Sequence, residues 1–413
     1  MSDPELTFTV GGLRRRAVIR LQGLNARLGA KAVQRRRKIL QHGRLQLLPQ
    51  AADVVVADKV ATAHDVAIAE RLLAAHHAAG RSAPALPPAA QRDDLWTMIA
   101  SRQGSFAAIL QRGDAHELAT YLCNVSRHDG SVGITQGDAE YARIVNDRSY
   151  REFVALMAKD KLVSLAEAVG ALPIENPEQG PLGEPIHYEA AEIVERICAC
   201  VGIDVTPPDV DGGLLKIDTG RGLFGERDAN AIYTAHLLRE TARDRQAPRI
   251  CEIGGGSGRV AYWSRRFGLT TYTLIDLPHV NVVQGYYALK SLPADEVSLY
   301  GEAPAGAAAG RLQILPDHAT AELRTPLFDV VLNQDSFPEM NAATVEDYLG
   351  WIKVCCRGSL MSINHESKPP YGRDMVHVSV PEAIAVAGGF ERVQRFSYWL
   401  RRGYVAELYR ITR

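Results

Sequence analysis

The sequence predicts an α/β fold with a mostly parallel sheet, an antiparallel hairpin at the C-terminal edge of that sheet, and an α-rich region before it. Three observations lead to this prediction. From about residue 248, short β-branched runs alternate with helical segments; before about residue 220, apolar residues recur at helical spacing; and two closely spaced strand-like runs end the chain. With 413 residues, 46% of them hydrophobic and 23% charged, the chain can bury a sizeable core over two or three domains.

The first expected unit, residues 1–50, is a basic arm. Eleven basic residues and no acidic residue lie between Arg14 and Arg44. A solvated helix explains this pattern, and contact with an anionic membrane surface is an alternative because leucine, valine and isoleucine are interspersed with the arginines. Nucleic acid is disfavoured, because the stretch from Arg14 to Arg44 has no aromatic residues to stack on bases and the whole chain has a net charge of −1.

The second expected unit, residues 51–220, is an α-rich domain that covers a ligand pocket or dimerises. Four segments place apolar residues on one helix face: 62–80, 94–112, 150–172 and 188–203. Gly80 is expected to end the first of them. Two proline-rich stretches, 80–94 and 172–187, interrupt the helical pattern and mark candidate boundaries. The polar, glycine-containing residues 124–138 are interpreted as a ligand-binding loop or as an ordinary helix connection.

The third expected unit, residues 221–413, alternates strands with helices. Five short apolar runs are predicted strands: 249–254, 271–276, 312–316, 328–334 and 360–364. Helical segments at 279–292 and 342–356 separate some of them, and the runs 390–400 and 404–413 are expected to form the edge hairpin. This alternation predicts a parallel sheet covered on both faces, with ligands bound beyond the carboxyl ends of its strands.

Four glycines follow the first predicted strand, in the segment CEIGGGSGRV. The dinucleotide fingerprint G-x-G-x-x-G needs a small residue three positions after Gly256, where this chain has Arg259. An acid-x-G-x-G-x-G pattern fits instead, and its members are Glu252, Gly254, Gly256 and Gly258. Glycines at these positions let the backbone turn sharply and lie against a ligand.

A second signal is Asp276, which ends the next predicted strand 18 residues after Gly258. A carboxylate at about this distance bonds ribose hydroxyls in dinucleotide-binding folds. The acidic residue, the spaced glycines and Asp276 together resemble the motifs of class I S-adenosylmethionine-dependent methyltransferases. The resemblance implies a Rossmann-like sheet, S-adenosylmethionine as the cofactor, and cofactor contacts from these residues. It also implies cofactor contacts from five others: Leu277, Asp317, Asn333, Arg227 and Tyr233, the last two near the methionine carboxylate.

Polar residues crowd the ends of the fourth and fifth predicted strands, in NQDSFPEM (333–340) and INHESK (363–368). With the tryptophan-containing helix between them, these segments resemble the bacterial sugar O-methyltransferases, and the likeness extends from about Gly225 to His365. It implies that the acceptor is a hydroxyl of a sugar or of a glycosylated natural product.

Transfer of a methyl group to a weakly acidic hydroxyl requires an aligned oxygen and a base. His365 is the first candidate base, because histidine is basic near neutral pH, and Asp335 is either the base or the carboxylate that orients His365. Glu339 and Glu366 are expected to bind acceptor hydroxyls, although Glu339 could instead cap the helix that begins near Asn341. A magnesium ion held by Asp335, Glu339 and His365 is the alternative to a histidine base.

The sequence predicts a cytoplasmic protein, because no signal peptide or apolar span is evident in it. We also expect the methyltransferase to be a homo-oligomer and to act on a small-molecule acceptor. A polyketide-type acceptor, methylated on oxygen or nitrogen, is an alternative that an apolar pocket would favour. A non-catalytic cofactor-binding module is another, and the complete glycine motif argues against it. The six cysteines lack the spacing of a zinc site and are expected to be reduced thiols.

Overall fold

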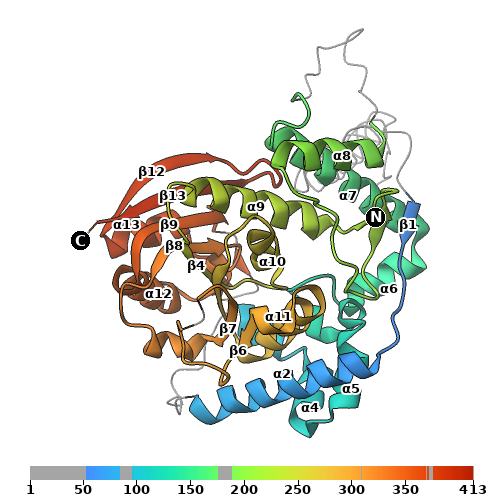
Figure 1. The fold of residues 1–413 in the computed structure, drawn as a ribbon, viewed down its shortest axis with the longest axis horizontal. Helices are drawn as coiled ribbons and strands as arrows, with labels where there is room; N and C mark the ends of the chain where they lie inside the picture. Colours follow the sequence, from blue (N-terminus) through green and yellow to red (C-terminus); the bar gives the residue numbers. More distant parts are fainter. Residues whose placement is uncertain are drawn as a thin grey trace, which may run out of the picture.

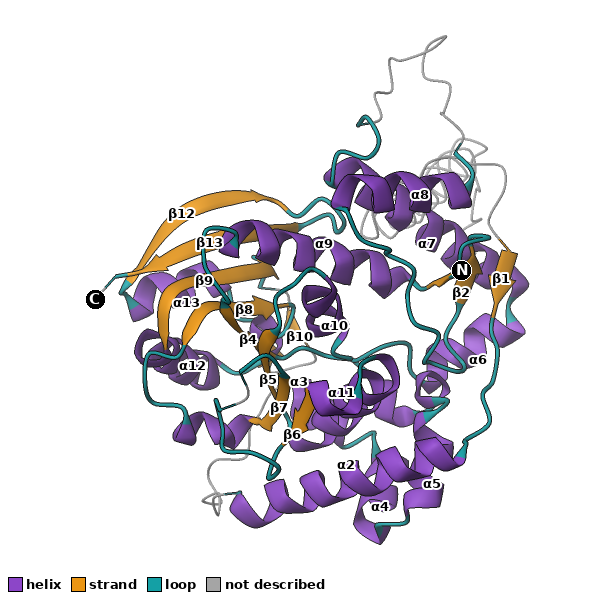
Figure 2. Ribbon diagram, in the orientation of Figure 1, coloured by secondary structure: helices purple, strands orange, loops and turns teal. Residues whose placement is uncertain are grey.

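The computed structural model of the protein describes residues 53–83, 95–174, 188–307, 309–368, 370–371 and 375–412. A large central sheet occupies the C-terminal part of the chain, and helices from the N-terminal part pack beside it (Figures 1 and 2). The basic arm and most of the two proline-rich stretches lie outside the described residues.

The central sheet has eight strands in the order β12-β13-β9-β8-β4-β5-β7-β6. Their bounds are β4 (Arg249–Ile253), β5 (Thr271–Asp276), β6 (Val297–Leu299), β7 (Leu312–Pro316), β8 (Phe328–Gln334), β9 (Cys356–His365), β12 (Phe390–Ser397) and β13 (Tyr404–Ile411). Strands β4 to β9 are parallel, β13 is antiparallel to β9, and β12 is antiparallel to β13. The prediction of a mostly parallel sheet with an antiparallel C-terminal hairpin is confirmed, and the short edge strand β6 is an addition to it.

Strand β4 is the point at which the strand order reverses. The chain passes from β4 to β5 and β7 on one side, then returns to place β8 on the other side of β4. In open α/β sheets, the loops that leave the strands at such a point diverge to opposite faces and leave a crevice. The loops after β4, β5 and β8 therefore border one crevice.

Helices cover both faces of the sheet, which explains why its central strands are buried along almost their whole length. All six residues of β5 are buried, as expected for a strand with no solvated face. Helices α9 (Glu226–Ala242), α10 (Arg259–Arg266) and α11 (Pro278–Ser291) share one buried cluster, and α12 (Ala342–Cys355) and α13 (Val380–Ala387) share the other.

The N-terminal part is mainly helical, as predicted. Its helices are α2 (Ala63–Ser82), α3 (Leu95–Ala100), α4 (Gly104–Arg112), α5 (Ala115–Leu122), α6 (Asp138–Asn146), α7 (Arg148–Ala168) and α8 (Ala190–Val201). Helix α2 continues two residues past Gly80, and the helix expected over 94–112 is two helices joined by a turn. A small antiparallel sheet was not expected, and its strands are β1 (Asp53–Val55), β2 (Lys216–Asp218) and β3 (Leu223–Phe224).

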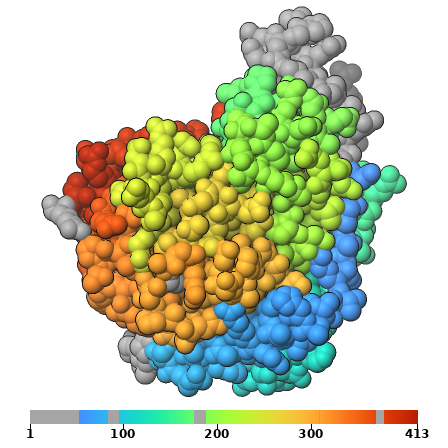
Figure 3. All heavy atoms as spheres, viewed as in Figure 1, coloured from blue at the N-terminus to red at the C-terminus, as the bar shows by residue number. Residues whose placement is uncertain are grey.

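The N-terminal helices pack directly on the helices that cover the sheet. Helix α2 lies against α11, and in Figure 3 its blue residues form the lower edge of the molecule. At this contact the buried Asp65 accepts a hydrogen bond from the Tyr286 hydroxyl (2.7 Å) and pairs with Lys290 (2.8 Å). One buried cluster therefore includes residues from both sides of position 220, and the domain boundary there stays a prediction. No helix among the described residues is long and apolar enough to cross a membrane.

Candidate functional site

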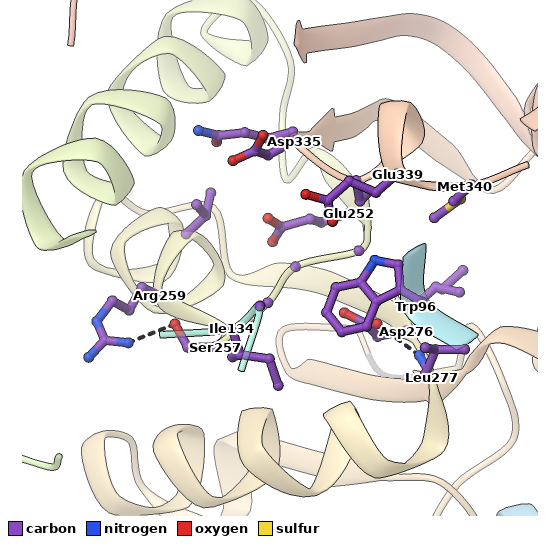
Figure 4. Close-up of a pocket in the computed structure, with 18 of the residues that line it drawn as sticks. Trp96, Ile134, Glu252, Ser257, Arg259, Asp276, Leu277, Asp335, Glu339 and Met340 are labelled. Carbon is purple, nitrogen blue, oxygen red and sulfur yellow. Dashed lines mark hydrogen bonds between the residues drawn. The ribbon is translucent and has the colours of Figure 1, made fainter. Parts of the chain in front are cut away.

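A pocket opens at the carboxyl ends of β4, β5 and β8, where the strand order predicts a crevice (Figure 4). The space between its walls, including the open mouth, is about 1210 Å³. We call one part of its lining the glycine end: Glu252, Gly254, Gly255, Gly256 and Asp276. We call a second part the Glu339 end: Trp96, Arg227, Asp335, Glu339 and Arg401.

The three glycines of the motif all adopt left-handed backbone conformations, but they do so in different surroundings. Gly254 has φ +74°, and an added Cβ would lie 2.2 Å from Oγ of Ser336, so this glycine allows the loops after β4 and β8 to approach. Gly256 has φ +56°, and an added Cβ would meet no atom within 4 Å. Gly258 begins α10 outside the pocket lining. Of the three, Gly256 is the one that leaves room for a ligand.

Two buried carboxyl groups flank this loop. Glu252 accepts a hydrogen bond from the Tyr272 hydroxyl (2.8 Å), and burial together with the nearby Asp276 raises the pKa of Glu252 to about 8. Asp276 accepts hydrogen bonds from its neighbour Leu277 N (2.8 Å) and from Gln284 Nε2 (2.7 Å). Burial raises the pKa of Asp276 to about 7 despite these bonds. Neither carboxyl group has a salt-bridge partner among the described residues, so both can receive polar groups of a ligand.

Three other predicted cofactor residues also line the pocket. Leu277 begins the loop after β5, and Asp317 follows β7 at the same edge of the sheet. Arg227, in the first turn of α9, has an exposed side chain and donates one hydrogen bond, from Nη2 to the carbonyl oxygen of Thr135 (2.8 Å). Its remaining guanidinium N–H groups can bind an anionic group in the pocket.

Tyr233 and Asn333 do not line the pocket, which corrects two of the sequence-based assignments. Tyr233 is buried in the core against the ring of Tyr398, with ring centroids 5.2 Å apart. Asn333 is fully buried, and its Nδ2 donates to the carbonyl oxygen of Ile253 (3.2 Å) and to Oγ of Ser336 (2.6 Å). Asn333 therefore holds the loop after β8 against the end of β4, a structural task in place of ligand contact.

Asp335 lies in the pocket but is already engaged by two partners. Arg401, in the turn between β12 and β13, forms an ion pair with it, and the Tyr404 hydroxyl donates a hydrogen bond to it. Although burial acts to raise the pKa of Asp335, these partners hold it below its usual value. An ionised carboxylate with a low pKa is a weak proton acceptor. Asp335 thus serves better to orient Arg401 than as the predicted base.

Glu339 is the carboxyl group at this end whose pKa suits proton transfer. It ends the short helix η6 (Phe337–Glu339), and burial together with the neighbouring Asp335 raises its pKa to about 8. The helix-capping alternative is wrong, because Asn341 itself caps α12 by accepting a hydrogen bond from Thr344 N (2.8 Å). Trp96 lines the same pocket as Glu339, and both residues are seen in Figure 4.

His365 and Glu366 lie outside the pocket lining. The ring of His365 contacts Tyr404 edge-on at 5.7 Å and lies 5.0 Å from His377, so Tyr404 is its neighbour on the pocket side. Glu366 is exposed and forms a two-pronged ion pair with Arg395. The described residues contain no cluster of three or more His, Cys, Asp or Glu that could hold a metal ion, so a shared magnesium ion gains no support.

Trp96, Arg259 and Arg401 are among the lining residues that the sequence analysis missed. Trp96 comes from α3 and Arg401 from a hairpin turn, and neither position carries a motif. Arg259 was noted only because it breaks the dinucleotide fingerprint. In the structure it is buried, pairs with Asp211 and Asp228, and donates to Oγ of Ser257 (2.7 Å). The Arg259 side chain therefore links α10 to α9 through Asp228, and to the segment before β2 through Asp211.

Comparisons with known proteins leave the function open. No protein-family model and no curated protein matches the chain. Among solved structures, one match is the Burkholderia thailandensis 1,6-didemethyltoxoflavin-N1-methyltransferase with bound S-adenosylhomocysteine, at TM-score 0.31 and 18% identity over 44% of this chain and 79% of that chain. Another is the magnesium protoporphyrin IX methyltransferase of Synechocystis PCC 6803 with bound S-adenosylmethionine, at TM-score 0.31 and 12% identity over 45% of this chain and 83% of that chain.

A third match is not named as a methyltransferase: the [4+2]-cyclase SpnF, at TM-score 0.33 and 15% identity over 45% of this chain and 82% of that chain. Scores and identities this low assign neither a family nor a function. The function must therefore be argued from the pocket itself.

Proposed function

We propose that the protein is an S-adenosylmethionine-dependent methyltransferase that methylates a hydroxyl group of a small molecule. One observation carries this proposal: the open face of Gly256 lies in a pocket between the buried carboxyl groups of Glu252 and Asp276, at the reversal point of a parallel sheet.

The residues of the glycine end fit the cofactor in chemistry as well as in space. Asp276, at the end of β5, would accept hydrogen bonds from ribose hydroxyls, and Glu252 would face the amino-acid portion. Arg227 offers unused guanidinium donors to a carboxylate from across the pocket. Gly256 leaves the loop bare where a side chain would intrude. When bound, the cofactor supplies an electrophilic methyl group on a sulfonium.

Glu339 is assigned as the general base in place of His365. It lines the same pocket as the glycine loop, and its pKa of about 8 leaves a useful fraction ionised at neutral pH without making it a weak acceptor. The Glu339 carboxylate would accept the proton that the acceptor hydroxyl loses on methylation. Asp335 and Arg401 form an ion pair that lines the same pocket. The Arg401 guanidinium would donate hydrogen bonds to oxygens of the molecule that is methylated.

For the acceptor we propose a sugar hydroxyl carried on a larger, partly apolar molecule. Glu339, Asp335 and Arg401 present polar groups suited to sugar hydroxyls, whereas Ile134 and Met340 add apolar surface to the lining. A glycosylated natural product would satisfy both kinds of surface. The sugar class comes from the resemblance of residues 225–365, and the mixed lining supports a glycoside more than a wholly apolar polyketide.

Calorimetric titration with S-adenosylhomocysteine tests the assignment. The wild type should bind, and Asp276→Asn, which keeps the shape of the side chain but removes its charge, should bind about 10- to 100-fold more weakly. Asp295→Asn, an exposed position outside the pocket, is the matched control and should bind like the wild type. Absence of binding by the wild type would sink the proposal.

A further inference from the structure

The turn that connects β12 to β13 carries Arg401 into the Glu339 end of the pocket. We call residues 398–403 the hairpin turn, and in Figure 1 it lies at the end of the hairpin opposite the C-terminus. Its first residue, Tyr398, is buried, and the Tyr398 hydroxyl donates a hydrogen bond to the carbonyl oxygen of Asn230 in α9 (3.0 Å). The start of the hairpin turn is therefore fixed to a helix that covers the sheet.

The next two residues of the hairpin turn are bonded to α7, a helix of the N-terminal part. Nε1 of Trp399 donates a hydrogen bond to Oε2 of Glu167 (3.0 Å). Nζ of Lys161 donates a hydrogen bond to the carbonyl oxygen of Leu400. Both α7 residues are buried. The three residues that precede Arg401 thus each have a hydrogen bond to an element outside the hairpin.

Lys161 is a costly residue to bury, because its ammonium group loses its hydration. It is 1% exposed, and the adjacent Leu162 shows that an apolar side chain can be buried in this part of α7. Burial lowers the pKa of Lys161 to about 8, although Glu226 favours the ammonium form. The hydrogen bond to Leu400 gives this lysine a task that an apolar side chain could not perform.

The guanidinium group of Arg401 is also held from the pocket side. It forms an ion pair with Asp335 and lies over the ring of Tyr404, 3.9 Å from the ring centroid. A guanidinium group is planar and donates hydrogen bonds in fixed directions. Because the turn is held by α7 and the side chain by Asp335 and Tyr404, the fold determines where the remaining N–H groups of Arg401 point.

We propose that Lys161 and Glu167 are positioning residues: from α7 they clamp the hairpin turn, so that Arg401 is held where it can bind the molecule that is methylated. This inference rests on the acceptor-binding role proposed for Arg401. Neither α7 residue lines the pocket, so both act through the hairpin turn. The N-terminal helices then contribute to acceptor binding without contacting the acceptor at these positions.

The first test measures backbone hydrogen exchange and requires no ligand. Lys161→Met keeps a long side chain but loses the donor, so the amides of residues 398–404 should exchange about 10- to 100-fold faster than in the wild type. Lys353→Met is the matched control, because Nζ of Lys353 also donates to a backbone carbonyl oxygen, that of Ala387 (2.8 Å), away from the pocket and the hairpin turn. It should leave exchange of residues 398–404 unchanged. Equal exchange of this segment in the two variants would overturn the inference.

Trp399→Phe tests the second contact, and it keeps the inference testable if Lys161→Met fails to fold. The variant retains an aromatic ring but lacks the N–H that bonds Glu167. Exchange of residues 398–404 should again be about tenfold faster. Unchanged exchange in Trp399→Phe would contradict the role of Glu167.

The second test separates acceptor binding from the chemical step. With glycoside acceptors, Lys161→Met should raise KM about tenfold and lower kcat by less than about threefold, because Arg401 binds the acceptor but does not receive its proton. Its affinity for S-adenosylhomocysteine should equal that of the wild type, whereas a general loss of structure would lower that affinity too. An unchanged KM together with faster exchange would overturn the inference. Absence of S-adenosylhomocysteine binding by the wild type would instead contradict the proposed function, so the two failures are distinguishable.

Discussion

The glycine end and the Glu339 end belong to one pocket but are built in opposite ways. The glycine end comes from two adjacent strands, β4 and β5, and the loops directly after them. The Glu339 end takes its residues from α3, α9, the loop after β8 and the turn between β12 and β13. The glycine end lies within residues 252–276 and can be recognised from the spacing of its residues. The Glu339 end combines four elements that are distant in the sequence, so it can be recognised only in the folded structure.

The two ends also treat their carboxyl groups differently. At the glycine end, Glu252 and Asp276 are buried without a cation, and burial raises the pKa of both. At the other end, Arg401 holds Asp335 ionised, and that charge helps to raise the pKa of Glu339 close by. At the Glu339 end, one carboxyl group, Asp335, therefore keeps a fixed negative charge, and the other, Glu339, can titrate as a base.

The largest effect is expected when the base is removed. Glu339→Gln should lower kcat by about 10²- to 10⁴-fold, because the acceptor proton loses its receiver, and should leave S-adenosylhomocysteine affinity unchanged. Initial rates of S-adenosylhomocysteine formation with glycoside acceptors measure this change.

His365→Ala is the matched comparison, since His365 lies outside the pocket lining. It should change kcat by less than about threefold. A loss in His365→Ala as large as that in Glu339→Gln would return the role of base to the histidine.

A smaller effect is expected at the glycine end, and here two glycines can be compared. Gly256→Ala should weaken S-adenosylhomocysteine binding by about 100-fold, equivalent to about 2.7 kcal/mol, because its methyl group enters the space left for the ligand. Calorimetric titration measures the affinity.

Gly268 provides the control for this substitution. It also has positive φ and no atom within 4 Å of an added Cβ, but it lies outside the pocket. Gly268→Ala should cost about 1–2 kcal/mol of stability through backbone strain and leave binding intact. Equal binding losses in the two variants would show that strain, and not ligand space, explains the effect at Gly256.

The smallest effect is on stability as a function of pH. Glu252, Asp276 and Glu339 have folded-state pKa values of about 7 to 8, against about 4 in an unfolded chain. Between about pH 5 and 7 the folded state therefore binds more protons, so the free energy of unfolding should fall as the pH rises. Glu339→Gln should make this fall shallower by up to about 1.4 kcal/mol per pH unit, measured by urea unfolding.

Glu366→Gln is the control for the pH experiment. Glu366 is exposed, and its ion pair with Arg395 lowers its pKa, so removing it should leave the fall between pH 5 and 7 unchanged. A fall that persists undiminished in Glu339→Gln would show that the Glu339 carboxyl group is not held protonated by its surroundings.

Much of the fold could be predicted from the sequence, because the local spacing of apolar residues indicates where strands and helices form. The predicted runs at 249–254 and 271–276 correspond to β4 and β5, and the C-terminal hairpin forms as expected. The small sheet β1-β2-β3 escaped prediction because its strands have two or three residues each and its pairing joins Asp53 to Asp218 across the N-terminal part. Pairing over that distance has no local signature.

The sequence by itself determined the parallel sheet, the glycine loop after β4 and the carboxylate at the end of β5, because periodicity and motif spacing are properties of neighbouring residues. Only the tertiary structure decided which polar residues share the pocket. It brought Arg401 to Asp335, placed His365 against Tyr404, and set Trp96 in the same pocket as Glu339. The physical reason is that a side chain's access to the pocket and its pKa depend on burial and on charges that folding brings close. No short stretch of the sequence determines either of these.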